Sequence, residues 1–389
     1  MTGPLAGTRV LDLTRLVPGA VCSQLLADLG AEIIKVEAPG PGDYMRAVGP
    51  PLAGAGYSYQ YATLNRGKRA VSVNLRVPAG ARLLRRLAGH CDVLIENYRP
   101  GVMASFGLSY DDLKGQLPEL IYCAISGFGQ AAGPAPAHDI NLLAMSGFLA
   151  GTGEIPVLPP APLADFETGE RAALAICAAL AGRPQSSGAF LDIAMLDGMV
   201  SWMMLAAADY LATGREPGGH NTLRSRQPVS GGRSPGYGAY QTSDGRFIAV
   251  GAVEDRLWQR LCEVTGLPEL VGCTGPADGI DARLAAVIAS RPLAEWMADF
   301  TAAGVPATPV SSVAAAVQDP AVRDRGLLRH VADAAGGSYE VVGWGLGADP
   351  GSARERPAAA PGADTAAVLA EIGITDSQLA ALRQEGVIA

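Results

Sequence analysis

Hydrophobic and polar positions alternate between two periods over the first third of the chain. Apolar runs of strand length are separated by stretches whose apolar positions recur every three to four residues, as on one face of a helix. The strand-like runs cover residues 8–14, 32–37, 69–76, 91–98 and 120–129, and the helical patterns cover residues 20–30, 79–90 and 110–117. Strands that alternate with helices at this spacing predict βαβ units and a parallel, doubly wound sheet.

The remaining chain is more helical and contains two changes of composition. Long apolar helices are predicted for residues 140–151, 169–182 and 195–214. Residues 214–238 are rich in Gly, Arg, Pro and Ser, which is typical of a linker. Residues 237–254 form two alternating runs around an Asp-Gly pair and predict a β-hairpin. A Pro/Gly/Ala-rich tract over 347–362 precedes a final amphipathic helix over 365–388.

These patterns predict an α/β chain in four parts. We expect a Rossmann-like, parallel-sheet large domain, a linker, a smaller α+β domain, and a segment that returns to dock on the large domain. Their expected bounds are 1–213, 214–238, 239–330 and 331–389. A chain of 389 residues is too long for a single ordinary core, which agrees with two domains.

Composition and charge narrow the class of protein. Apolar residues make up 49% and charged residues 17%, as in a well-buried globular enzyme. A net charge of −8 argues against nucleic acid as a partner. The six cysteines are scattered without a CxxC pair, the N-terminus lacks a secretory-signal pattern, and the longest apolar stretch is too short and interrupted to span a bilayer. We therefore expect a cytoplasmic protein that does not act at a membrane.

Motifs for cofactors and metals are missing from the places where they are expected. The turn after the first strand, TRLVPGAVCSQ, has no G-x-G-x-x-G, and no GxxxxGK[ST] loop occurs. The four histidines lie far apart, without HExxH spacing. No GxSxG follows a strand. We expect neither a metal nor a resident cofactor. The remaining candidates for catalytic groups are carboxylates and one histidine.

Three carboxylates and one histidine stand at the ends of predicted elements. Asp165 begins a long apolar helix, and His138-Asp139 precedes another. Glu254 follows an apolar strand. A carboxylate at a helix N-terminus is expected to stay ionised, because the helix dipole and the unpaired N–H groups favour the anion. The alternative for each carboxylate is a plain helix cap, with His138 incidental to the cap of its helix.

Two further segments are candidate ligand sites. Arg66, Lys68 and Arg69 form a short basic run that can hold phosphates, and the alternative for this run is a solvated surface loop. The segment ENYRPGV lies just past the carboxyl end of a predicted strand, where α/β proteins bind ligands. Its candidate residues are Asn97, Tyr98, Arg99 and Gly101.

Taken in order, these segments resemble the class III CoA-transferase (CaiB/BaiF) family, and within it the α-methylacyl-CoA racemases. The matching segments follow the order of the family and cover most of the chain. They are GPLAGTRVLDLTRLVPGAVCSQLLADLGAEIIKVE, LNRGKRAVSVNLR, DVLIENYRPGVMASFGLSYDDL, LIYCAISGFGQ, AHDINLLAMSG, LADFETGERAALAICAAL, LDIAMLDG and DGRFIAVGAVE. On these segments the chain is identified as a member of the family.

The resemblance implies an assembly and a substrate. It implies an interlocked homodimer, with each active site between the large domain of one chain and the small domain of its partner. The CoA moiety is expected to bind on the large domain as part of an acyl-CoA substrate, with no further cofactor. The residues that the resemblance places along the CoA are Arg66, Lys68, Arg69, Arg76, Asn97, Tyr98, Arg99, Gly101 and Gly127.

The resemblance also implies roles for the four candidate catalytic residues. In the transferases, the aspartate matching Asp165 attacks the thioester and forms a mixed anhydride. In the racemases it is one of two bases, and the histidine matching His138 is the other. The glutamate matching Glu254 supports that histidine from the partner chain, and Asp139 is expected to orient the pair. Most transferases of the family lack this histidine, so His138 favours racemisation.

Inverting the carbon next to a thioester needs two groups on opposite faces of that carbon. One group removes a proton and the other delivers one, which an imidazole and a carboxylic acid can do near neutral pH. We expect backbone N–H groups at the starts of the two helices, those of His138-Asp139 and of Asp165, to stabilise the enolate oxygen.

Three hypotheses stand at this point. The first is a 2-methylacyl-CoA racemase that uses His138 and Asp165. The second is a CoA-transferase with Asp165 as the nucleophile, because DFETGE stands where the racemases carry DFGGGS, and TG after the aspartate is common among transferases. The third is an inert acyl-CoA-binding protein.

Overall fold

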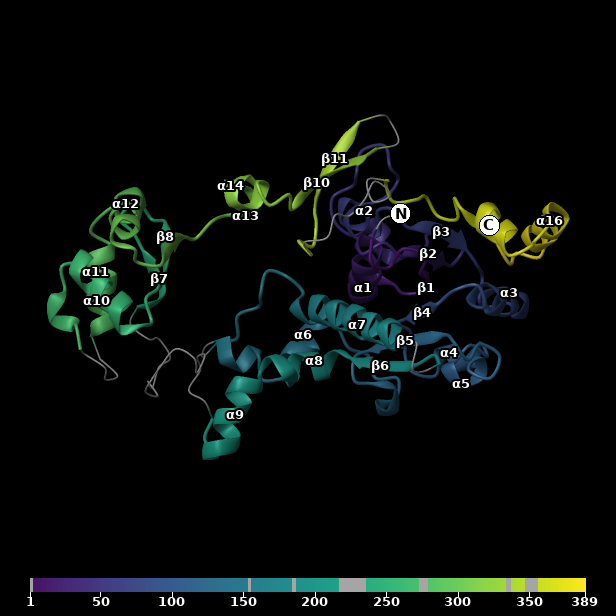
Figure 1. Cartoon of the computed structure of the whole chain (residues 1–389), viewed down its shortest axis with the longest axis horizontal. Coiled ribbons are helices and arrows are strands. Elements are labelled where there is room, and N and C mark those ends of the chain that lie inside the picture. The colour runs from purple at the N-terminus through teal and green to yellow at the C-terminus, as the bar shows by residue number, and fades with distance from the viewer. Residues whose placement is uncertain are drawn as a thin grey trace. The chain divides into compact units, whose positions relative to one another are not determined.

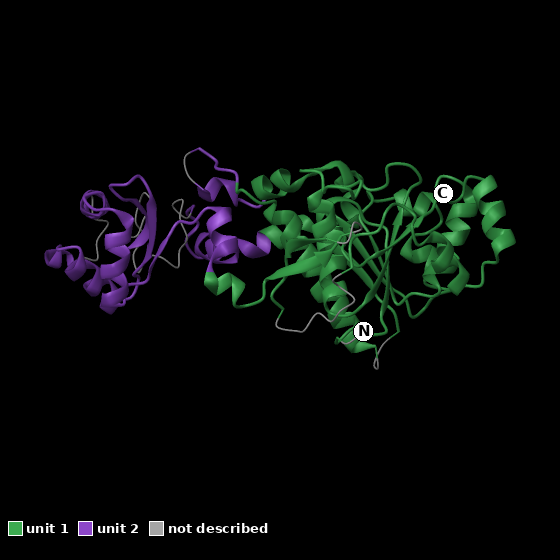
Figure 2. Ribbon diagram, turned by 90° about the horizontal axis from the view of Figure 1, so that it is seen from above, with its two compact units in different colours: residues 1–145, 159–199, 320–389 green, residues 146–158, 200–319 purple. Residues whose placement is uncertain are grey.

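The computed structural model describes residues 3–152, 155–183, 187–216, 236–272, 279–333, 337–346 and 356–389. These residues form two compact units, which are coloured separately in Figure 2. Unit 1 comprises residues 1–145, 159–199 and 320–389, and unit 2 comprises residues 146–158 and 200–319. Most of the expected linker, residues 217–235, lies outside the described ranges. The four domain bounds expected from the sequence stay a prediction.

Unit 1 is built on a six-stranded sheet in the order β3-β2-β1-β4-β5-β6 (Figure 1). Every neighbouring pair of strands is parallel. The strands are β1 Arg9–Asp12, β2 Glu32–Glu37, β3 Arg69–Ser72, β4 Val93–Glu96, β5 Ile121–Ser126 and β6 Phe190–Ala194. The parallel, doubly wound sheet predicted from the alternating patterns is therefore confirmed. The strand order reverses between β1 and β4, and this reversal is where folds of this kind bind ligands.

Helices connect the parallel strands and cover the sheet. Those up to residue 202 are α1 Leu16–Asp28, α2 Tyr59–Asn65, α3 Pro78–Ala88, α4 Val102–Ser105, α5 Tyr110–Leu113, α6 Asp139–Met145, α7 Leu163–Gly182 and α8 Met195–Trp202. Helix α1 joins β1 to β2, and α7 joins β5 to β6. Because each joined pair of strands is parallel, each of these helices begins at the carboxyl edge of the sheet.

Helices α1 and α7 pack against each other over the sheet. Nearly every residue of α1 is buried, including Pro18 and Val21. The close approach depends on Gly169 of α7, because a Cβ atom there would lie 2.6 Å from the carbonyl oxygen of Pro18 and 2.4 Å from Cγ1 of Val21. This contact fixes the start of α1 beside the start of α7.

The end of the chain also belongs to unit 1. Its elements are α14 Pro320–Arg323, β10 Leu328–Ala332, β11 Ser338–Val342, α15 Thr365–Glu371 and α16 Asp376–Gln384. Helix α15 lies along β3, where Ala70 donates its N–H to the Asp364 carboxylate at 2.8 Å. The single helix predicted for 365–388 is in fact two helices, because Gly373, with a φ of +77°, ends the first of them.

Unit 2 contains an antiparallel sheet in the order β7-β8-β9. Its elements are α9 Met204–Thr213, β7 Tyr237–Gln241, β8 Phe247–Gly251, α10 Asp255–Val264, α11 Ile280–Ile288, α12 Leu293–Ala303, β9 Ala307–Pro309 and α13 Val313–Gln318. The predicted hairpin is confirmed as β7 and β8, and Gly245 in its turn has a φ of +74°. The helix predicted for 195–214 is interrupted at Met203. None of the helices in the described ranges is long and apolar enough to cross a membrane.

The contact between α1 and α7 gives the first testable prediction. We expect Gly169→Ala to lower the free energy of unfolding by ~1–2 kcal/mol, because the cost of overpacking exceeds the gain in helix propensity. Gly182→Ala is the matched control, since a Cβ at this last residue of α7 would meet nothing within 4 Å. Chemical denaturation measures both variants. Equal effects of the two substitutions would show that packing on α1 is not the cause.

Candidate active site

Asp165 is the third residue of α7, at the carboxyl edge of the sheet. The first N–H groups of this helix have other acceptors. Ala164 and Asp165 donate their N–H groups to Oδ1 of Asp139, at 2.7 and 3.3 Å, and Phe166 donates to the carbonyl of Pro162 at 3.1 Å. These three amides are therefore not available to an enolate oxygen, and our expectation for this helix end was wrong. The same expectation for the start of α6 stays a prediction.

Asp139 caps a helix, but not the one that the sequence suggested. Helix α6 begins at Asp139 itself, and its carboxylate reaches across to the first turn of α7. The start of α6 is held instead by Asn141, whose Oδ1 accepts the N–H of His138 at 2.9 Å. Asp139 thus joins the starts of the two helices that carry His138 and Asp165.

The protonation of Asp165 differs from the sequence-based expectation. Burial, and secondarily the nearby charge of Asp139, raises the pKa of Asp165 to about 7. The prediction of a fully ionised carboxylate was wrong, because the helix amides that would have favoured the anion already bond to Asp139. Near neutral pH the Asp165 carboxyl group exists in both protonation states.

His138 stands immediately before α6, and its side chain is exposed in the described chain. Its backbone is fixed by a reciprocal pair of bonds, since Asn141 also donates its N–H to the His138 carbonyl at 2.9 Å. The imidazole therefore projects from a rigid helix start, one residue from the carboxylate that contacts the amide of Asp165.

Glu254 lies in unit 2, directly before α10. Its carbonyl accepts the N–H groups of Leu257 and Trp258 at 2.8 and 2.9 Å, and its side chain makes no capping bond. The carboxylate is exposed. The side chain of Glu254 therefore does not cap α10.

The basic run is tied into the fold of unit 1. Arg66 is 1% exposed and pairs with Asp28 at 2.6 Å. Lys68 is 4% exposed and donates to Oγ of Ser23 at 2.7 Å. The alternative interpretation, a solvated surface loop, is therefore wrong for Arg66 and Lys68. Arg69 pairs with Glu32 and Glu371 at the amino edge of the sheet, away from Asp165. The role of all three toward a CoA phosphate stays a prediction.

The loop after β4 lies at the same carboxyl edge as Asp165. Asn97 bonds to the backbone of Arg15, and Tyr98 lies under the Arg15 guanidinium. Arg99 is exposed, and Gly101, with a φ of +89°, precedes α4.

The two other expected CoA contacts lie in loops. Arg76 is exposed. Gly127, after β5, accepts the N–H of Leu196 at 3.0 Å, and a Cβ there would lie 3.0 Å from Cβ of Ala137. Their role toward CoA stays a prediction.

Two charged residues at this edge were missed from the sequence, Arg15 after β1 and Glu96 at the end of β4. Burial raises the pKa of Glu96 to about 8, and its Oε2 accepts the N–H of Tyr98 at 2.8 Å. Arg15 directly follows an apolar strand-like run, and that position is the signal that would have found it. Within the described residues, no three His, Cys, Asp or Glu side chains gather as they would around a metal ion.

The chain is similar in sequence and in structure to known proteins. The family model described as CoA-transferase family III matches residues 5–365. The chain is 34% identical over 356 residues to the succinyl-CoA:glutarate CoA-transferase of Mus musculus, covering 87% of this chain and 79% of that protein. It is 34% identical over 334 residues to the alpha-methylacyl-CoA racemase of Homo sapiens, covering 83% and 81%. A solved CAIB/BAIF family protein from Brucella suis is 30% identical with a TM-score of 0.81, covering 96% of this chain and 100% of that chain.

The contact between Asp139 and the first turn of α7 gives a second prediction. Asp139→Asn keeps a side-chain oxygen for the two amides but removes the negative charge. We expect the pKa of Asp165 to fall below about 7, and to stay above its ordinary value because burial is the larger cause. An NMR titration of the Asp165 carboxyl carbon measures the pKa. Asp111→Asn, at an exposed site in α5, is the control and should leave it unchanged.

Proposed function

The chain belongs to CoA-transferase family III, and we propose that it inverts the α-carbon of a 2-methyl-branched acyl-CoA thioester. The observation that supports this activity is the raised pKa of Asp165. A carboxyl group whose pKa is about 7 is suited to give and take protons at neutral pH. The imidazole of His138 lies at the adjacent helix start, and imidazole is the side chain that most often acts as a general base in enzymes.

The proposed reaction is a two-base proton transfer. In one direction, the imidazole removes the α-proton and the electron pair of the broken C–H bond moves into the thioester carbonyl, giving an enolate. The neutral carboxyl of Asp165 then delivers its proton to the opposite face. In the reverse direction the two groups exchange roles. Both groups must return to their starting protonation states before the next turnover.

The assembly belongs to the same proposal. The acyl-CoA binds on unit 1, with its CoA moiety along the loop after β4 and the residues implied by the family resemblance. A homodimer brings Glu254 of one chain toward His138 of the other. An exposed carboxylate near an imidazole favours the protonated ring and supports its role as a base.

CoA transfer is the second candidate, and a specific observation favours it. In the part of the chain that the structure describes, no donor reaches the Asp165 carboxylate, so its oxygens are unengaged. The anion would attack the thioester carbonyl and expel the CoA thiolate, giving a mixed anhydride. The thiolate would attack the aspartyl carbonyl and release the first acid, and the second acid would take the CoA by the reverse sequence. Several relatives are transferases by name, including those that use glutarate and oxalate.

One experiment separates these activities. A single epimer of a 2-methylacyl-CoA is incubated with the protein in D2O, first without and then with a free carboxylic acid. Racemisation predicts deuterium at C2 and loss of optical purity without the acid. Transfer of CoA to the added acid, with no deuterium exchange at C2 in its absence, would show that the protein is a CoA-transferase and not a racemase. CoA binding without either activity would leave an inert binding protein.

His138→Ala is the companion variant. We expect it to reduce proton exchange at C2 by roughly 100-fold or more, the usual contribution of a general base. His90→Ala, at an exposed histidine in unit 1, is the matched control and should retain full exchange. Full exchange in the His138 variant would remove this residue from the mechanism. Asp165→Asn is expected to stop both candidate reactions.

The proposed homodimer has its own test. Helix α9 has the sequence MLAAADYLAT but no buried residue, and Met204 and Leu211 are 63% and 81% exposed. Since a monomer rarely leaves such an apolar helix uncovered, we expect sedimentation velocity to show a dimer. Leu211→Lys should weaken it, and Val313→Lys, equally exposed at 81% in α13, should not. A wild-type monomer at micromolar concentration would contradict the proposal.

A further inference from the structure

A groove of about 660 Å³ lies on unit 1 between α3 and the segment that contains α4 and α5, which Figure 1 shows beside one another. We call it the α3 groove. Leu84 of α3 packs in the core cluster that contains Leu11 of β1, whereas α1 and α7 pack in the cluster that contains Val10. Successive residues of a strand point to opposite faces of its sheet, so α3 and α7 cover opposite faces. The α3 groove is therefore separate from the layer that carries Asp165.

Three arginines of α3 line this groove, Arg82, Arg85 and Arg86. Helix α3 connects β3 to β4, which are parallel strands of one sheet, so it runs from the carboxyl edge of the sheet to the amino edge. Arg85 and Arg86 are in its last turn, and Arg82 is one turn earlier. Positions three and four apart lie on the same face of a helix, so three positive charges lie within about one turn of each other.

The charges of these arginines are not neutralised by any acidic side chain within the described ranges. Arg85 donates to the carbonyl of Gly107, and Arg86 donates to the carbonyl of Ile372 at 2.5 Å. A carbonyl is a neutral acceptor, so it orients a guanidinium without cancelling its charge. The side chain of Arg82 is exposed and makes no hydrogen bond in the described part of the chain. No Asp or Glu is among the described residues that line the groove.

The rest of the lining is mostly apolar. Ala81, Phe106 and Leu117 are half-buried, and Gln116 is exposed. A groove whose charges all have one sign raises the local concentration of oppositely charged molecules. Its volume is within the range of sites that hold a small molecule. The α3 groove therefore combines a concentrated positive charge with an apolar wall, which suits a small, multiply charged anion.

We propose that the α3 groove binds a diphosphate group, carried by a molecule other than the acyl-CoA substrate. Guanidinium groups match the geometry of phosphate oxygens. Side chains one helical turn apart have Cβ atoms about 5–6 Å apart, so neighbouring phosphates each contact an arginine. The CoA of the substrate is proposed to lie along the loop after β4, at the carboxyl edge of the sheet. Arg85 and Arg86 are at the opposite end of α3, so this is a second site.

The test titrates the full-length protein calorimetrically with inorganic pyrophosphate, with ADP and with inorganic phosphate. Pyrophosphate supplies the diphosphate alone, ADP adds a nucleoside that can cover the apolar wall, and phosphate is the reference with a single group. Each titration is repeated with saturating CoA, because CoA contains a diphosphate of its own. The measurement needs no turnover, so a failed racemase or transferase assay does not affect it.

We expect pyrophosphate or ADP to bind roughly tenfold or more tightly than phosphate, with or without CoA. Equal affinities for pyrophosphate and ADP would assign the site to a free diphosphate, and tighter binding of ADP would assign it to a nucleotide. Either result supports the proposal.

Arg82→Gln is the variant of choice, because its side chain bonds to no other part of the described chain. We expect it to weaken diphosphate binding roughly 10- to 100-fold, the range of a hydrogen bond to a charged group. Arg82→Lys keeps a cation and should lose less, which separates loss of charge from loss of folding. Arg383→Gln, at an exposed arginine of α16, is the matched control and should leave the affinity unchanged.

Three results would overturn the proposal. Absence of binding by the wild-type protein at about 1 mM pyrophosphate and ADP would show that the groove holds no diphosphate. Unchanged affinity in Arg82→Gln would place any bound diphosphate elsewhere on the protein. Loss of pyrophosphate and ADP binding in the presence of CoA would show that the groove is part of the CoA site and not a second one.

Discussion

The bonds from the Asp139 carboxylate to the first turn of α7 are the interaction on which the candidate site depends. They connect the start of α6, which carries His138, to the start of α7, which carries Asp165. They also occupy the amides that would otherwise lower the pKa of Asp165. One side chain therefore positions the two candidate groups, and its charge adds to burial in raising the pKa of Asp165 to about 7.

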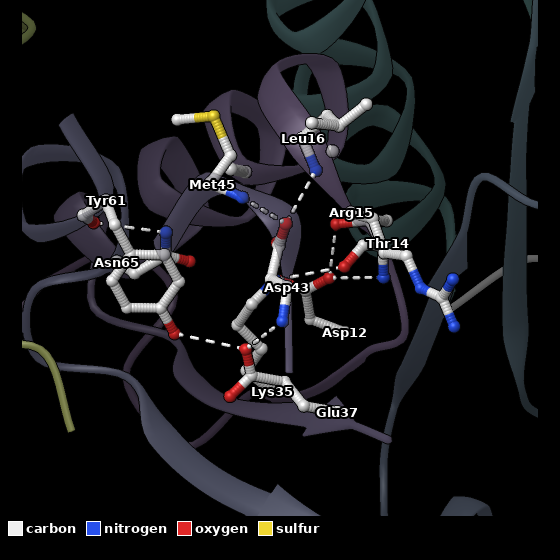
Figure 3. Close-up of polar contacts among 12 residues, drawn as sticks. Asp12, Thr14, Arg15, Leu16, Lys35, Glu37, Asp43, Met45, Tyr61 and Asn65 are labelled. Carbon is white, nitrogen blue, oxygen red and sulfur yellow. Dashed lines mark hydrogen bonds and ion pairs between the residues drawn. The ribbon is translucent and has the colours of Figure 1, made fainter. Parts of the chain in front are cut away.

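A second feature of unit 1 is a cluster of buried charges near the carboxyl ends of β1 and β2. Lys35 is 1% exposed, pairs with Asp43 and donates to the carbonyl of Thr14 at 3.0 Å. Asp12 is fully buried between Lys35 and Lys68, and burial lowers the pKa of Lys68 to about 7. Buried ion pairs add little net stability, but removal of one partner leaves an uncompensated charge and is costly. Figure 3 shows Asp12, Thr14, Lys35 and Asp43 side by side where the loops after β1 and β2 meet.

The sequence predicted the parts of the fold that local pattern determines. Apolar runs of strand length alternating with helical periods predicted the parallel sheet, and an Asp-Gly pair predicted the turn of the hairpin. It did not predict contacts between distant residues. Asp139 and Ala164 are 25 positions apart, so a local capping rule assigned the carboxylate to the wrong helix. We expected the basic run to bind phosphate or to face solvent. The sequence does not show that Arg66 pairs with Asp28 and that Lys68 donates to Ser23, both in α1.

The protonation of Asp165 bears on both candidate reactions in different ways. A nucleophile for CoA transfer must be the anion, and burial disfavours that form in this site. A proton-transfer residue needs both forms, because the acid of one direction is the base of the other. The raised pKa of Asp165 therefore suits proton transfer, and its unengaged oxygens suit nucleophilic attack.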